Sequence, residues 1–66
     1  MLPPAIRNAD VLVRDRSSGK VLAGLFTVGK TWGWIVKDTT GKQMHDFFFN
    51  TMDQASDFAR AELEGA

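Results

Sequence analysis

The sequence predicts one small α+β domain, an antiparallel meander of about four strands with one C-terminal helix packed on one face. Three observations support this expectation. Short runs rich in β-branched and aromatic residues fill most of the chain. Gly-Lys pairs separate these runs, and the last segment changes from a two-residue period to a helical one. Strands that precede a helix in this way are typical of α+β folds.

The chain has 66 residues and no cysteine, a length that fits one domain. Because so short a chain buries only about 60% of its unfolded surface, its core must come from its own apolar side chains or from a partner's. No apolar run approaches the roughly 18 residues of a membrane span. The first residues also lack the layout of a secretory signal. We therefore expect a cytoplasmic protein with no membrane contact.

The strands are expected to follow an extended lead-in over residues 1–9, because Pro3 and Pro4 disfavour helix in the residue before each of them. The β-rich runs predict strands over residues 10–16, 21–28, 31–38 and 43–50. Each turn between these strands carries a Gly-Lys pair, and glycine supplies the positive φ that tight hairpins need.

A helix is expected over residues 52–64. Thr51 and Gln54 fit a capping box, and Asp53 lies in the first turn, where the helix dipole favours negative charge. Gly65 suits the C-terminal stop. The apolar stripe at helical spacing consists of Ala55, Phe58, Ala59 and Leu63.

Alternation along the strands assigns side chains to the two faces of the predicted sheet. The face under the helix is expected to carry Val11, Val13, Trp32, Trp34, Val36, Phe47 and Phe49. The open face is expected to carry Leu12, Arg14, Ile35, Lys37, Met44, Asp46 and Phe48. An apolar patch with a charged rim, as on this open face, often marks an interaction site. Scattered surface hydrophobes, or a register shifted by one residue, would explain the same pattern without binding.

This open face predicts a non-catalytic protein-docking module. We expect a stand-alone accessory or inhibitor protein, of the size common in phages and mobile elements. The predicted partner-binding residues are Leu12, Arg14, Ile35, Lys37, Met44 and Phe48. A homodimer through the same face would also fit, because a two-fold axis would bury the patch on both copies.

The charges are unevenly placed, although the formal net charge is zero. Residues 1–43 carry seven basic and three acidic side chains, whereas residues 44–66 carry one basic and five acidic side chains. The sequence therefore predicts a basic sheet that could meet phosphates and an acidic helix that could meet a basic protein groove. A solvated helix beside lysine-rich turns is the alternative explanation.

Patterns that would carry catalysis are weak. The segment GLFTVGKT, from Gly24 to Thr31, matches the phosphate-loop expression G-x-x-x-x-G-K-[ST], but that site needs a helix after the loop. The residues after it predict a strand, so we interpret Gly29-Lys30 as a hairpin turn. His45 is the only histidine, and no cysteine or well-placed serine accompanies it. We expect no enzymatic activity, no metal and no cofactor.

The segment TWGWIVKDTTGKQMHDFFFNTMDQASDFARA joins a W-G-W strand, a glycine turn, an aromatic strand and an alanine-bearing helix. This order resembles AP2-type DNA-binding domains and the arm-binding domains of phage integrases, which combine three strands with one helix. The matching positions are Trp32, Gly33, Trp34, Val36, Lys37, Asp38, Gly41, Phe49, Thr51, Ala55, Phe58 and Ala61.

The resemblance implies a sequence-tolerant DNA-binding module as the alternative function. In those domains the open sheet face enters the major groove with arginines and tryptophans. The corresponding candidate contacts here are Arg14, Arg16, Lys30, Trp32 and Lys37. The chain departs from the pattern in its shorter tryptophan spacing, its fewer first-strand arginines and Asp46 on the candidate face.

Overall fold

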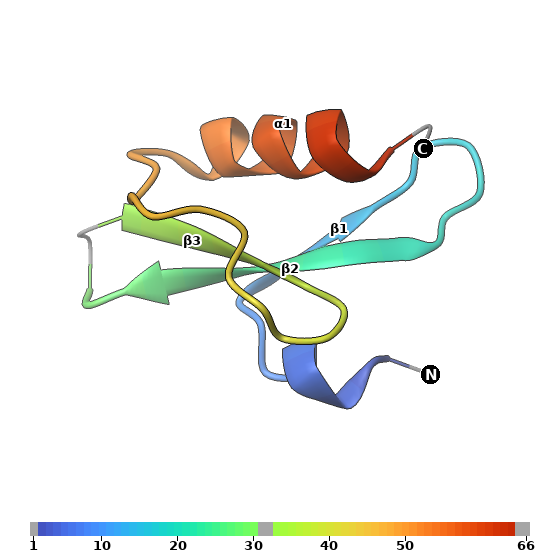
Figure 1. Ribbon diagram of the computed structural model, residues 1–66, viewed down its shortest axis with the longest axis horizontal. Helices are drawn as coiled ribbons and strands as arrows, with labels where there is room; N and C mark the ends of the chain where they lie inside the picture. Colours follow the sequence, from blue (N-terminus) through green and yellow to red (C-terminus); the bar gives the residue numbers. More distant parts are fainter. Residues whose placement is uncertain (1, 31–32, 65–66) are drawn as a thin grey trace.

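The computed structural model describes residues 2–30 and 33–64 of the chain, and Trp32 and Gly65 lie outside these ranges. A three-stranded antiparallel sheet carries one helix along one side (Figure 1). The elements are the 3-10 helix η1 (Pro4–Ile6), the strands β1 (Val11–Arg14), β2 (Val21–Val28) and β3 (Gly33–Asp38), and the helix α1 (Met52–Leu63). The α+β class is therefore confirmed, with three strands rather than the four predicted.

The strands lie in the order β1-β2-β3, so β2 pairs with both neighbours. Leu25 of β2 lies opposite Val11 of β1 and Val36 of β3. Because side chains in register share a face, this apolar row points to one side of the sheet. The register of β1 against β2 shifts after Val13, which leaves Leu22 as an extra residue of β2. Such a bulge interrupts the alternation of side chains.

The main core lies between the sheet and α1. Its buried side chains are Val13, Ala23, Leu25, Val36, Ala55 and Ala59. The two residues from α1 are alanines, and their small side chains let the helix approach the strands closely. Half-buried side chains surround this core, including the predicted Val11, Trp34, Phe49, Phe58 and Leu63. The helical stripe and these strand positions are thus confirmed.

α1 begins with the predicted capping box. Thr51 has an extended backbone, and its Oγ1 accepts a hydrogen bond from the Gln54 N–H at 3.1 Å. The Gln54 side chain reaches one residue further back than usual, since its Oε1 accepts the Asn50 N–H at 3.2 Å. Asp53 lies in the first turn, as predicted. Neither helix of the described residues has the length and apolar character that a membrane span needs.

The N-terminal segment covers the middle of the opposite face of the sheet (Figure 1). The extended lead-in predicted over residues 1–9 is wrong, because Pro4 opens η1, where its fixed φ suits a helix. Ile6 is fully buried and lies over Gly24 of β2. A Cβ added at Gly24 would lie 3.0 Å from the Ile6 Cβ and 2.8 Å from the Ala9 Cβ. Glycine in the central strand therefore makes room for this N-terminal cover, residues 4–9.

The segment after β3 does not form the strand predicted over residues 43–50. Two isolated bridges join it to β3: Lys37 with Gln43, and Trp34 with Phe49. Between the bridges, the His45 side chain replaces a backbone acceptor, because its Nε2 accepts the Val36 N–H at 2.8 Å. The intervening residues leave the ladder, so the strand alternation predicted for them does not hold.

The Gly-Lys turns have the conformation that the sequence predicts. Gly19, Gly29 and Gly41 have φ values of 76°, 62° and 88°. In the GLFTVGKT segment, the residues up to Val28 belong to β2, and the chain enters β3 at Gly33. This strand-turn-strand arrangement differs from the strand-loop-helix arrangement that binds phosphates.

Candidate functional site

The face of the sheet opposite α1 has an apolar end and a basic end, separated by the N-terminal cover. The apolar end lies toward the β2–β3 turn, where Phe26 pairs with Ile35 and Val28 pairs with Gly33. We call four apolar side chains at this end the apolar patch: Phe26, Val28, Ile35 and Phe48. The first three are half-buried, whereas Phe48 is 54% exposed.

Phe48 reaches the apolar patch because residue 33 is a glycine. A Cβ added at Gly33 would lie 2.9 Å from the Phe48 Cβ and 2.9 Å from the Phe49 carbonyl oxygen. A larger residue would therefore push the segment after β3 away from the strand. The close approach fixes Phe48 against the sheet while more than half of its surface stays accessible.

Lys37 forms the charged rim of the apolar patch. Its Nζ lies 5.0 Å from the centre of the Phe26 ring. A cation in this position contributes about 0.5–1 kcal/mol at an exposed site. A partner with a carboxylate beside its own apolar surface would complement this arrangement, because opposite charges across an interface fix its register.

A second group of aromatic rings lies between the segment after β3 and α1. His45, Phe47, Phe49 and Phe58 form it, and the contacting pairs have ring centres 4.7 to 5.4 Å apart. Phe47 is 54% exposed, so the prediction that α1 covers Phe47 is wrong. The break in the ladder explains this, because alternation does not fix side-chain direction outside a paired strand.

His45 has a structural role in this group. Its Nε2 accepts the Val36 N–H, which requires that Nε2 carry no proton. Its Nδ1 is buried and has no hydrogen-bond partner in the described structure. Within residues 2–30 and 33–64, no three His, Cys, Asp or Glu side chains are placed to hold a metal ion. The imidazole therefore supports the backbone of β3.

Three of the predicted partner-binding residues lie in or beside the apolar patch: Ile35, Lys37 and Phe48. Leu12 lies on the same face, on β1 opposite Gly24. Arg14 lies at the basic end. Met44 packs against the core, so its predicted place on the open face is wrong. Gln43 bridges Lys37, so the next residue, Met44, lies beside Val36 on the helix side of the sheet.

The predicted nucleic-acid contacts are spread along the sheet. Arg14 and Arg16 lie where β1 ends, whereas Lys30 follows the far end of β2. The intervening strand of eight residues separates these positions by about 23 Å. Lys37 lies at the rim of the apolar patch, and Trp32 lies outside the described residues.

Two carboxylates stabilise turns at the basic end. Asp15 Oδ1 accepts the N–H groups of Ser18 at 3.1 Å and Ser17 at 2.8 Å. Asp38 Oδ1 accepts the Thr40 hydroxyl and backbone N–H groups of its own turn. These bonds favour the ionised carboxylates and lower both pKa values, chiefly through the Ser18 N–H for Asp15 and the Thr40 hydroxyl for Asp38.

Sequence reasoning missed Phe26 and Val28 in the apolar patch and Ile6 in the N-terminal cover. Apolar residues occupy both sides of β2, so alternation does not assign a face to them. Ile6 lies in a short segment whose apolar residues follow neither a strand nor a helix period. The available signal was Gly24, since a glycine inside a strand often marks a close approach of another segment.

Comparisons with protein-family models, curated proteins and solved structures give no match for this chain. Its function is therefore inferred from the placement of its own side chains.

Proposed function

We propose that the chain is a non-catalytic protein-docking module, an accessory or inhibitor protein that acts through the apolar patch. The observation that carries this proposal is Phe48, which is 54% exposed yet fixed against the sheet beside Gly33. The close approach at Gly33 holds the start of this side chain at the sheet, so its ring is presented from a defined position. Phe47 and Met52 add exposed apolar surface on the same segment and at the start of α1.

The expected partner presents an apolar side chain to the patch and a carboxylate to Lys37. A second copy of the chain also meets this description, because the exposed Asp46 lies in the same segment as Phe48. A two-fold axis would then place each patch against the other copy. Both occupants are protein surfaces, and one experiment distinguishes them.

The test places a photo-crosslinking phenylalanine analogue at position 48 or, as the matched control, at position 47. The two side chains have the same exposed fraction, 54%, but Phe47 belongs to the His45 aromatic group and not to the apolar patch. We expect a discrete cross-linked product from position 48 in cells that express the protein, and little from position 47. The Ile35→Ala substitution should remove this product.

Mass spectrometry of the product identifies the occupant. A cross-link between two chains of 7.3 kDa assigns the patch to a homodimer, and a different polypeptide identifies the partner. Equal products from positions 47 and 48, or a product that survives Ile35→Ala, would show that the apolar patch is not the docking surface. Far-ultraviolet circular dichroism verifies that each variant is folded.

The second candidate function is DNA binding by the basic sheet. The favouring observation is that residues 1–43, which include all three strands, carry seven basic and three acidic side chains. Binding of a labelled duplex should weaken steeply with salt. Each substitution of Arg14, Arg16 or Lys37 by Gln should lower the salt slope by about 0.9 per lost phosphate contact. The absence of binding at low salt would eliminate this function.

A further inference from the structure

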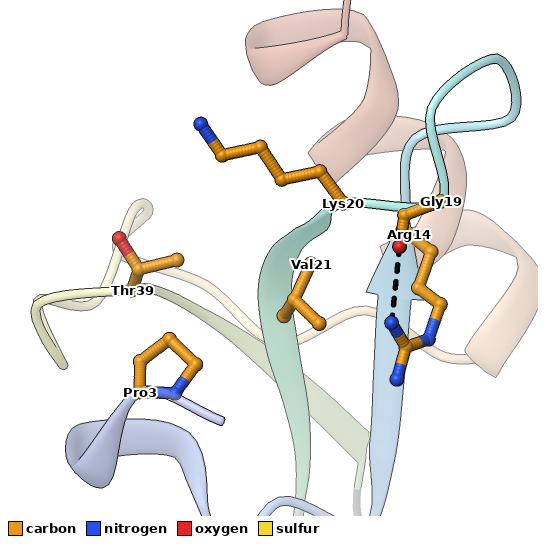
Figure 2. A pocket seen from close by; sticks show the side chains of 6 residues that line it. All are labelled: Pro3, Arg14, Gly19, Lys20, Val21 and Thr39. Atoms are coloured by element: carbon orange, nitrogen blue, oxygen red, sulfur yellow. Dashed lines mark hydrogen bonds between the residues drawn. The ribbon is translucent and has the colours of Figure 1, made fainter. Parts of the chain in front are cut away.

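A hollow of about 410 Å³ lies at the basic end of the sheet. Figure 2 shows the residues that line it. The N-terminal segment, the β1–β2 turn and the turn after β3 surround it. Its lining residues are Pro3, Arg14, Gly19, Lys20, Val21 and Thr39. This volume lies within the range of about 300–1,000 Å³ typical of small-molecule sites.

The lining is positively charged. It includes the cations Arg14 and Lys20, the hydroxyl of Thr39 and no acidic side chain. The nearest carboxylates along the chain, Asp15 and Asp38, accept hydrogen bonds within their own turns instead. An anion in the hollow would therefore meet donors and no carboxylate on its lining.

Arg14 is already oriented in this hollow. Its Nη1 donates a hydrogen bond to the Gly19 carbonyl oxygen at 3.0 Å, which fixes the guanidinium beside β2 (Figure 2). The other N–H groups of the guanidinium stay available, and their planar fork matches the oxygens of a phosphate or carboxylate. Gly19 itself is fixed in the turn, because its N–H donates to the Asp15 carbonyl oxygen at 2.8 Å.

Part of the lining of the hollow is apolar. Pro3 and Val21 are half-buried and line it, and Figure 2 shows the Val21 side chain between Arg14 and Thr39. A ligand that carries both an oxyanion and a small apolar group would contact both kinds of wall. Inorganic phosphate would contact only the polar groups of the lining.

The geometry points to a binding site for a small organic anion, a phosphate monoester or a carboxylate, that also carries a compact apolar group. Arg14 would bind the oxyanion, and Pro3 and Val21 would contact the apolar group. Lys20 and Thr39, whose side chains lie apart from the Arg14 guanidinium in Figure 2, would add positive charge and a hydroxyl group at the rim. The site is independent of the apolar patch, which lies at the other end of β2.

The test is a titration of the ¹⁵N-labelled full chain at low salt, followed by amide chemical shifts. Inorganic phosphate, phenyl phosphate and phenylacetate are the probes. We expect saturable shifts at Gly19, Lys20, Val21 and Thr39, with phenyl phosphate binding more tightly than inorganic phosphate. Tighter binding of phenyl phosphate than of phenylacetate would identify phosphate as the preferred oxyanion, and the reverse would identify carboxylate.

Matched variants locate the site. Arg14→Gln should weaken phenyl phosphate binding about tenfold, as expected for loss of a hydrogen bond to a charged group. Lys20→Gln should weaken it less, because this side chain contributes positive charge without a direct hydrogen bond to the oxyanion. Arg7→Gln and Lys42→Gln make the same charge changes outside the hollow and should leave the affinity unchanged. Arg14→Lys keeps the charge but loses the planar fork, so it should bind with intermediate affinity.

Three results would overturn the inference. One is the absence of saturable shifts with all three probes. Another is an equal loss of affinity in the control variants, which would show attraction to the overall charge alone. The last is displacement of phenyl phosphate by duplex DNA with a steep salt dependence, which would assign these cations to a nucleic acid instead. The cross-linking result at position 48 does not depend on any of these outcomes.

Discussion

The two faces of the sheet are covered in different ways. α1 extends along one face and buries Ala55 and Ala59 against the strands. On the other face, η1 has three residues and covers the middle with Ile6. The ends of that second face stay accessible, one apolar and one basic. A small cover therefore shapes two separate candidate sites on a face that a second helix would have buried completely.

The largest expected effect is on the free energy of unfolding, which we compare for one substitution under α1 and one under the N-terminal cover. Leu25→Ala removes a fully buried side chain under α1, which should lower the free energy of unfolding by about 2–5 kcal/mol. Ile6→Ala removes an equally buried side chain, but the short cover can detach, so we expect a loss near 2 kcal/mol. Urea denaturation followed by circular dichroism measures both losses. Equal losses would show that the cover unfolds together with the helix-side core.

An intermediate effect is expected where the cover meets the central strand. In Gly24→Ala the new methyl group would lie 2.8 Å from the Ala9 Cβ, so the cover must move at a cost of about 1–3 kcal/mol. Hydrogen exchange should accelerate at the Ala9 amide, which donates to the Ile6 carbonyl oxygen. The size swap Gly24→Ala with Ala9→Gly should recover part of the loss. Strictly additive losses would refute this contact.

The smallest expected effect is the acid sensitivity of the turn after β3, which contacts the cover through Gly41 and Ala5. Because the folded protein lowers the pKa of Asp38 from 3.8, the ionised carboxylate stabilises the fold above that pH. This contribution is lost as the pH falls below 3.8 through the folded pKa. Asp38→Asn should therefore lower the free energy of unfolding at neutral pH. In this variant the free energy of unfolding should also decrease less steeply as the pH falls below 3.8.

Urea denaturation at several pH values measures this dependence. Asp57→Asn, on the exposed side of α1, is the matched control and should keep the acid profile of the natural chain. An Asp38→Asn profile parallel to that of the natural chain would show that the carboxylate does not stabilise the turn.

Local signals made the helix and the strands predictable. The Thr51 and Gln54 pair predicted the start of α1, and the Gly-Lys turns predicted where three strands begin and end. These features depend on neighbours in the sequence. In the candidate docking surface, Ile35 was predictable for the same reason, since it alternates with the buried Val36. Phe48 instead lies there through its contact with Gly33, because the strand predicted for its segment does not form.

The remaining features depend on contacts between distant segments. Sequence alternation could not show that the imidazole of His45 would bind the Val36 N–H and end the ladder. The shift of Met44 into the core follows from that same segment. Nor does any local pattern around Ile6 indicate that it packs over Gly24, which is distant along the chain.

The hydrogen bonds between β3 and the segment that follows it also determine whether this edge of the sheet can pair with a strand of another chain. The outward N–H and C=O groups of Trp34 are paired with Phe49, and those of Val36 are paired with His45 and Met44. The opposite edge strand, β1, has four residues. An occupied edge and a very short edge are both poor templates for strand addition. Any partner would therefore have to recognise side chains on a face of this protein, because neither edge of the sheet offers much free backbone for pairing.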